Sequence, residues 1–204
     1  MSVVPRAATP VGVILAGGKA SRMGGRAKGL AHVGGMRIID RVAITLRSVV
    51  DDLLVVSGRP DAGSWIPGVR VLADERPGLG PIGGIVTALR STRADVLVVG
   101  WDMPFVTTRL LAPLLHTASA APIVLWRGAG EVQPLCGLYR TTALPGLDAA
   151  IASGERGLGR AALAMGAELL PVDDRNGFFS VNCTDDLARA EELARQTPIT
   201  TALA

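Results

Sequence analysis

Short, uninterrupted apolar runs alternate with stretches of helical periodicity along most of this chain. Leu53–Val56 and Val96–Val99 are apolar at every position, which is typical of strands that are buried on both faces of a parallel sheet. Between such runs, apolar residues recur every three or four positions, as in helices that pack on a sheet. The alternation predicts an α/β fold that is Rossmann-like, with a mostly parallel sheet flanked by helices.

The expected elements follow one another without a linker or an internal repeat. We predict strands at residues 11–16, 53–56, 69–72, 96–99, 123–126, 135–139, 168–172 and 179–181. We predict helices at residues 36–50, 81–90, 107 or 108 to 116, 143–153, 158–165 and 184–196. We therefore expect a single domain at residues 11–196, between a flexible N-terminal tail at 1–10 and a C-terminal tail at 197–204. A chain of 204 residues can bury one full core.

Composition argues against several classes of protein. No apolar run approaches the ~18 residues of a membrane-spanning helix, and the first ten residues lack the apolar core of a signal peptide. We expect a cytoplasmic protein with no membrane partner. The formal net charge is only +3, without a stripe of basic and aromatic residues, so we predict no nucleic-acid partner. Cys136 and Cys183 lack the paired spacing of a zinc site or a disulfide framework.

The strongest functional signal is the glycine-rich stretch that follows the first predicted strand. Residues 17–29, GGKASRMGGRAKG, combine glycines with four cations, and no acid precedes Asp40. Glycine allows backbone N–H groups to approach a ligand closely, and the cations attract negative charge. Lys19 and Lys28 are the only lysines of the chain, and both fall here. The stretch predicts a polyphosphate site, with a solvated turn as the structural alternative.

Other polar residues are expected at the same edge of the sheet. Ser57-Gly58, Asp74 and Asp102 each follow a predicted apolar strand. Ligands of α/β sheets bind beyond the carboxyl ends of the strands, so we expect one cleft that includes the glycine stretch. Asp102 is a candidate ligand for Mg²⁺, which proteins hold through one or two carboxylates together with phosphate oxygens. A turn or a helix cap is the alternative role for Asp102.

Several segments together resemble the molybdenum cofactor guanylyltransferases, which are nucleotidyltransferases with the fold of nucleotide-diphospho-sugar transferases. LAGGKASRMGGRAK, at residues 15–28, resembles the long signature of that family. DERPGLGPIGGI at 74–85 resembles a segment of its nucleotide pocket, and DMPF at 102–105 resembles its D-x-P-[FY] motif. QPLCGLY at 133–139 and NCTDDL at 182–187 resemble segments on the acceptor side.

The resemblance implies transfer of GMP from GTP to the terminal phosphate of molybdopterin, with release of pyrophosphate and with Mg²⁺ as the cofactor. It implies catalytic roles for Lys28 and Arg22, and Asp102 as the metal ligand. The implied nucleotide-binding residues are Leu15, Ala16, Gly17, Gly18, Lys28, Ser57, Gly58, Asp74, Gly80 and Asp102. The implied acceptor-binding residues are Gln133, Pro134, Leu135 and Asn182. Transient contact with molybdoenzymes or their chaperones is a further partner hypothesis.

The chain departs from the family pattern at several positions, including Ile82 for Leu and Cys183 for Thr, and three departures bear on the function. Ala27 stands where an Asp usually precedes the signature lysine, Gly58 where an Asn reads the base, and Ser180 where a first Asn is usual. These departures leave two alternatives open: a related nucleotidyltransferase for cytidylate or sugar phosphates, and a non-catalytic protein that binds nucleotide or pterin. Gly17 favours guanine, because relatives that transfer cytidylate usually have LAAG.

Overall fold

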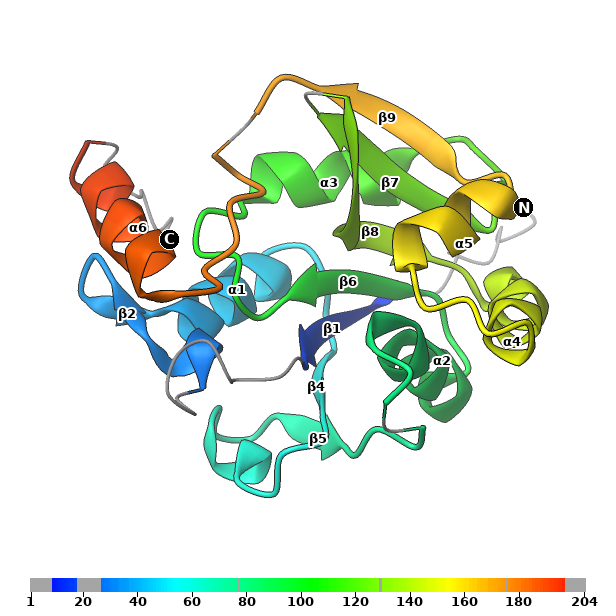
Figure 1. The fold of residues 1–204 in the computed structure, drawn as a ribbon, viewed down its shortest axis with the longest axis horizontal. Coiled ribbons are helices and arrows are strands. Elements are labelled where there is room, and N and C mark those ends of the chain that lie inside the picture. The colour runs from blue at the N-terminus through cyan, green and yellow to red at the C-terminus, as the bar shows by residue number, and fades with distance from the viewer. Residues whose placement is uncertain (1–8, 18–26, 77, 129, 175, 197–204) are drawn as a thin grey trace, which may run out of the picture.

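Seven strands form the central sheet of the computed structural model, which describes residues 9–17, 27–76, 78–128, 130–174 and 176–196 (Figure 1). Their order across the sheet is β5 (Arg70–Leu72), β4 (Leu53–Ser57), β1 (Val11–Ala16), β6 (Val96–Gly100), β8 (Glu131–Tyr139), β7 (Ile123–Gly128) and β9 (Glu168–Val172). β8 runs antiparallel to both of its neighbours, and all other neighbouring pairs are parallel. The predicted fold, a mostly parallel α/β sheet in a single domain, is confirmed.

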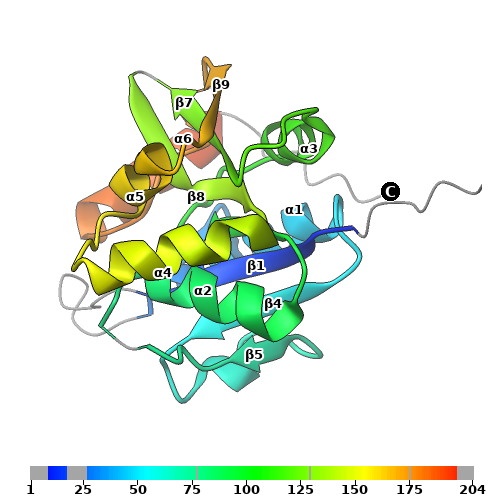
Figure 2. The same ribbon diagram turned by 90° about the vertical axis from the view of Figure 1, so that its right-hand side faces the viewer.

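Helices cover both faces of this sheet (Figures 1 and 2). On one face, Val13 and Leu15 of β1 pack in a core with α2 (Pro81–Thr92), α4 (Leu144–Ala152) and α5 (Leu158–Ala164). On the other face, Ile14 and Ala16 pack in a core with α1 (Ile38–Arg47) and α3 (Thr108–His116). Successive side chains of a strand point to opposite faces, so a strand between two such cores is apolar throughout.

A small hairpin, β2 (His32–Val33) and β3 (Met36–Arg37), precedes α1 and was not predicted. Gly34 and Gly35 form its turn with positive φ angles of 56° and 80°, which glycine adopts without strain. The turn pairs Met36 and Arg37 back onto β2, so the helix begins at Ile38 rather than at residue 36.

The last helix, α6 (Thr184–Gln196), packs against this hairpin. The Glu191 carboxylate accepts hydrogen bonds from the Gly34 N–H at 3.2 Å. The buried Arg41 guanidinium donates to the Val33 and Gly34 carbonyls from the other side. The hairpin therefore packs against the last described helix of the chain.

The prediction of a strand at residues 179–181 is wrong. The segment runs as a loop across the carboxyl end of β6, where the Val181 N–H donates a single hydrogen bond of 2.9 Å to the Asp102 carbonyl. Phe178 and Val181 are apolar because they are buried in the core, and not because they belong to a sheet ladder.

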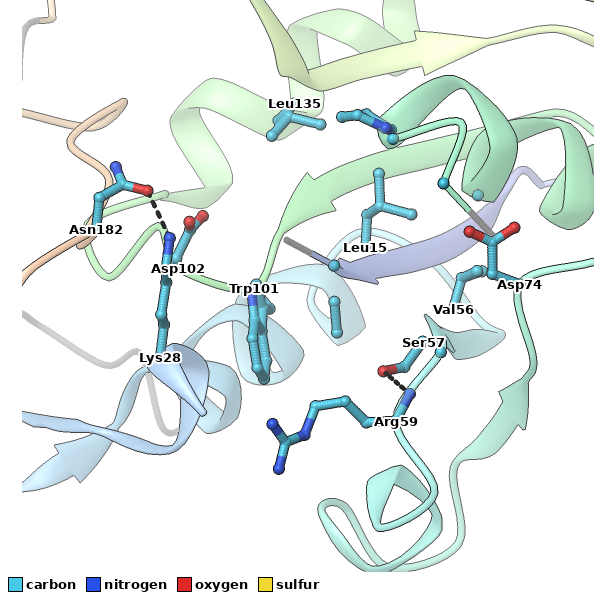
Figure 3. A pocket seen from close by; sticks show the side chains of 17 residues that line it. Leu15, Lys28, Val56, Ser57, Arg59, Asp74, Trp101, Asp102, Leu135 and Asn182 are labelled. Carbon is cyan, nitrogen blue, oxygen red and sulfur yellow. Dashed lines mark hydrogen bonds between the residues drawn. The ribbon is translucent and has the colours of Figure 1, made fainter. Parts of the chain in front are cut away.

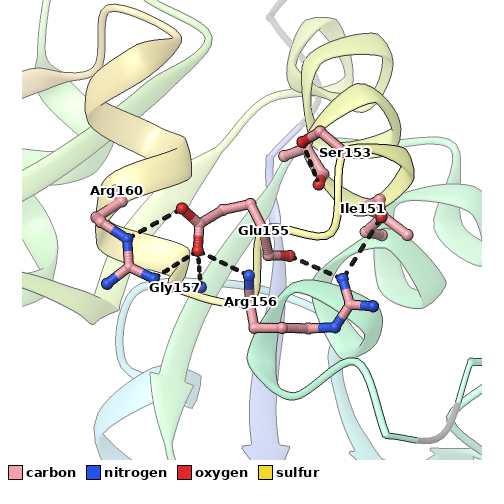
Figure 4. A network of polar contacts seen from close by, with 7 residues as sticks. Ile151, Ser153, Glu155, Arg156, Gly157 and Arg160 are labelled. Carbon is pink, nitrogen blue, oxygen red and sulfur yellow. Dashed lines mark hydrogen bonds and ion pairs between the residues drawn. The ribbon is translucent and has the colours of Figure 1, made fainter.

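Glu155 organises the connection between α4 and α5 (Figure 4). Its carboxylate accepts hydrogen bonds from the Arg160 guanidinium at 2.6 and 3.0 Å and from the backbone N–H groups of Gly157 and Arg156. Arg160, followed by these N–H groups, lowers the pKa of Glu155 to about 2.

Throughout the described ranges, no helix combines the length and the apolar character needed to cross a membrane.

Candidate active site

A pocket of about 640 Å³ lies at the carboxyl ends of β1, β4 and β6 (Figure 3). The residues that line it come from strand ends, from the turn before α2 and from the loop before α6. They are Leu15, Ala16, Gly17, Lys28, Val56, Ser57, Gly58, Arg59, Asp74, Gly78, Gly80, Pro81, Gly84, Trp101, Asp102, Leu135 and Asn182. The cleft expected from the strand ends is therefore present, and it includes both edges of the glycine-rich stretch.

Most of the predicted site residues line this pocket, but two of the predicted acceptor residues do not. Gln133 lies on β8 opposite Trp126, and Pro134 lies next to it, where the β7–β8 register shifts. The Pro134 carbonyl accepts a hydrogen bond of 2.5 Å from the Tyr139 hydroxyl. Gly18 and Arg22 fall outside the described residues, so their predicted roles are not addressed by the geometry.

One end of the pocket carries opposite charges (Figure 3, left). The Lys28 ammonium donates a hydrogen bond of 2.8 Å to the Asn182 side-chain carbonyl. Lys28 forms no ion pair with any carboxylate in the described part of the chain. Burial raises the pKa of Asp102 above its usual value, and the positive charge of Lys28 opposes that shift. The ammonium and the carboxylate therefore lie near each other without being paired.

The turn that carries Lys28 contacts a tryptophan stack that the sequence did not reveal. Gly29 lies directly on Trp101, so closely that a Cβ atom there would be 2.5 Å from the indole Cε3. Trp65 stacks on Trp101, with ring centroids 5.0 Å apart and planes inclined by 20°. Trp101 is only 4% exposed. The short 3-10 turn Lys28–Leu30 thus rests on a rigid aromatic base.

The opposite end of the pocket is built from glycine turns (Figure 3, right). Gly78 and Gly80 have φ angles of 89° and 64°, which side-chain-bearing residues rarely adopt. The turn leads into α2, which begins with Pro81. Asp74 Oδ1 accepts a hydrogen bond of 3.0 Å from the Arg76 N–H. A helix N-terminus and open glycine backbone present N–H groups to a ligand.

The pocket offers single carboxylates to a divalent cation. The described ranges contain no group of three or more His, Cys, Asp or Glu side chains that could hold a metal ion. Asp102 lies in the pocket beside Lys28, and Asp74 lies at the other end. A single carboxylate fits Mg²⁺, which keeps several waters and is usually held together with phosphate oxygens of a substrate.

Comparison with known proteins assigns this chain to a family. Residues 12–169 match the family described as the MobA-like NTP transferase domain. The chain belongs to this family. It is 36% identical over 189 residues to the molybdenum cofactor guanylyltransferase of Cereibacter sphaeroides, a match that covers 91% of this chain and 97% of the relative.

Solved structures agree with the assignment to the MobA-like transferases. The molybdopterin-guanine dinucleotide biosynthesis protein A of Archaeoglobus fulgidus is 25% identical, with a TM-score of 0.76 over 91% of this chain and 99% of that chain. A nucleotidyl transferase from Methanothermobacter, 19% identical, shares the fold with a TM-score of 0.73 and covers 93% of this chain and 99% of its own. The expected nucleotidyltransferase fold is confirmed.

Proposed function

We propose that this MobA-like transferase is a molybdenum cofactor guanylyltransferase, which transfers GMP from GTP to the terminal phosphate of molybdopterin and releases pyrophosphate. The observation that carries the proposal is the pocket itself. It joins an ammonium, a carboxylate and open glycine backbone at the carboxyl edge of the sheet. The named relative from Cereibacter sphaeroides supports the identity of the two substrates.

The attacking group requires no general base from the protein. A phosphate monoester has a second pKa of about 6, so it is mostly ionised at neutral pH and can attack the α-phosphorus of GTP directly. The oxygen that bridges the α- and β-phosphates leaves with the pyrophosphate. What remains for the protein is in-line positioning and neutralisation of charge. We assign neutralisation to Lys28, and to Arg22 on the basis of the sequence signature.

The cation is proposed to be Mg²⁺, held by Asp102. When bound, it would neutralise charge on the triphosphate. The Asp102 side chain is suited to this role because it lies in the pocket beside Lys28 and is not engaged in an ion pair among the described residues.

The nucleotide and the acceptor are proposed to occupy opposite ends of the pocket. Backbone groups of Leu15–Gly18 and the turns at Ser57-Gly58 and Asp74–Gly80 would hold the nucleotide. Leu135 and Asn182 would contact molybdopterin from the other end. Gln133 and Pro134 lie outside the pocket lining, so their contacts with the acceptor stay predictions. A cytoplasmic location and contact with molybdoenzymes or their chaperones also stay predictions.

A second candidate is a transferase for another nucleotide, which Gly58 favours. A Cβ atom at Gly58 would meet nothing within 4 Å, so this part of the pocket is open and lacks a side chain to read the base. Pyrophosphate release with molybdopterin and GTP, CTP or ATP separates the candidates. Buried donors and acceptors left unpaired by the wrong base cost about 1–3 kcal/mol each, so GTP should be preferred by about tenfold or more. A preference for CTP would overturn the guanylyl assignment, and absence of pyrophosphate with every triphosphate would indicate a binding protein.

A further inference from the structure

We propose that Asn182 is a positioning residue that tethers Lys28 through a neutral acceptor, and that Asp186 fixes this tether from the start of α6. The proposal rests on the guanylyltransferase function above, but its central contact can be tested without turnover. Lys28 and Asn182 are 154 positions apart in the chain, and their side chains meet at 2.8 Å. Figure 3 shows the two side chains pointing toward each other at one end of the pocket.

The orientation of the Asn182 amide is fixed at both of its ends. A lysine ammonium has only donors, so the Asn182 atom that faces it must be the carbonyl oxygen. The amide nitrogen then donates to the Ser180 carbonyl at 3.3 Å. Ala27, the residue before Lys28, has no side chain that could hold the ammonium. The loop before α6 therefore supplies the partner that the residue before the lysine does not.

Asp186 holds the backbone from which Asn182 projects. Its Oδ2 accepts hydrogen bonds from the Asn182 N–H at 2.8 Å and from the Cys183 N–H at 3.0 Å. Asp186 also lies in the first turn of α6, where the helix dipole favours a negative charge. The carboxylate thus joins α6 to the loop that reaches Lys28.

An uncharged acceptor suits Lys28 because of the charges that the substrate and the pocket bring near it. An amide oxygen accepts the hydrogen bond without cancelling the charge of Lys28, whereas a carboxylate would form an ion pair that the triphosphate must displace. Held on Asn182, the ammonium is also kept from pairing with Asp102. Both the positive charge and the carboxylate therefore stay available for the substrate and its cation.

The contact can be observed directly because the chain has only two lysines. Lysine side-chain nitrogens are labelled with ¹⁵N, and the Lys28 signal is assigned with a Lys19→Arg variant. In nucleotide-free protein we expect an ordered Lys28 ammonium, which becomes mobile in Asn182→Ala and in Asp186→Asn. Asp185→Asn is the matched control, since Asp185 is exposed on the same turn of α6 and takes no part in the tether. A mobile Lys28 ammonium in the unmodified protein would overturn the proposal.

Turnover then separates position from charge. Asn182→Ala should lower kcat for GMP transfer by about 10- to 100-fold, the scale of a misplaced catalytic group. Asn182→Asp keeps the shape and should keep Lys28 ordered, yet it should lower kcat and raise the KM for GTP. Asn182→Asp with the kcat and KM of the unmodified protein would contradict the need for a neutral acceptor. If Asn182→Ala raises only the KM for molybdopterin and Lys28 stays ordered, Asn182 acts on the acceptor alone and the proposal fails.

Discussion

Replacing Gly29 by alanine tests whether the tryptophan stack sets the position of Lys28. The added Cβ would lie 2.5 Å from Trp101 Cε3, 2.8 Å from Cδ2 and 2.8 Å from the Trp101 carbonyl oxygen. Ordinary contacts of this kind are 3.4–4 Å, so the turn has to move away by about 1 Å. The neighbours cannot simply yield, because Trp101 is itself stacked on Trp65 and one of the three atoms belongs to the backbone.

Two effects of known size follow from this displacement. Overpacking costs about 1–3 kcal/mol of unfolding free energy. A shift of about 1 Å in a catalytic group can cost about 10²-fold in rate. We therefore expect Gly29→Ala to lower kcat for GMP transfer by about 10²-fold and to lower the urea midpoint by an amount equivalent to about 1–3 kcal/mol.

The chain offers a closely matched control for this variant. Gly63 is also the middle residue of a 3-10 turn, but it is exposed, and a Cβ there would meet nothing within 4 Å. Gly63→Ala should change the unfolding free energy by less than about 0.5 kcal/mol and leave turnover unchanged. If Gly29→Ala behaves like Gly63→Ala in both assays, Trp101 does not determine where Lys28 lies, and the reasoning is refuted.

Three further variants test the other charged groups. Lys28→Ala should lower kcat by about 10²–10³-fold, the scale of one preorganised electrostatic group, with an unchanged thermal melt; near-normal turnover would remove Lys28 from the mechanism. Asp102→Asn should lower turnover and raise the Mg²⁺ concentration needed for half activity, whereas an unchanged Mg²⁺ dependence would leave Asp74 as the better candidate ligand. The pKa of Glu155 is lowered from 4.5 to about 2 in the folded protein, so its carboxylate stabilises the fold above pH 4.5 and this contribution is lost as the pH falls toward 2. Glu155→Gln should therefore have a lower urea midpoint than the unmodified protein at pH 7, with a gap that closes as the pH falls from 4.5 toward 2; a gap independent of pH would contradict the role of the charge.

The sheet could be predicted from sequence because its central strands obey a simple rule. Val96–Val99 has to be apolar throughout since both of its faces are covered, and few other structures explain such a run. The same reasoning failed at residues 179–181, where Val181 is buried and Phe179 partly buried within a loop. It also failed at Met36 and Arg37, because the pairing of a two-residue strand depends on the conformation of Gly34 and Gly35 rather than on periodicity.

Some residues of the site could likewise be predicted from the sequence, and others could not. Residues that follow strands, such as Asp102 and Ser57, could be placed because the topology brings strand ends together. Trp101 and Arg59 also line the pocket and were missed, although each lies within two residues of a predicted site residue. The Lys28–Asn182 contact joins segments 154 positions apart and depends on side-chain packing, so no local sequence pattern predicts it. Gln133 lies beyond the register shift of the β7–β8 pair and does not line the pocket, and that shift likewise arises from strand pairing.

The position of an isotopic label tests the proposed transfer most directly. The protein is incubated with molybdopterin, Mg²⁺ and GTP labelled with ³²P at either the α- or the γ-phosphate, and the products are separated. We predict that the α-label enters a pterin–guanine dinucleotide, that the γ-label leaves entirely in pyrophosphate, and that neither product forms without molybdopterin. Release of the γ-label as inorganic phosphate, or of the α-label as free GMP without a dinucleotide, would contradict guanylyl transfer.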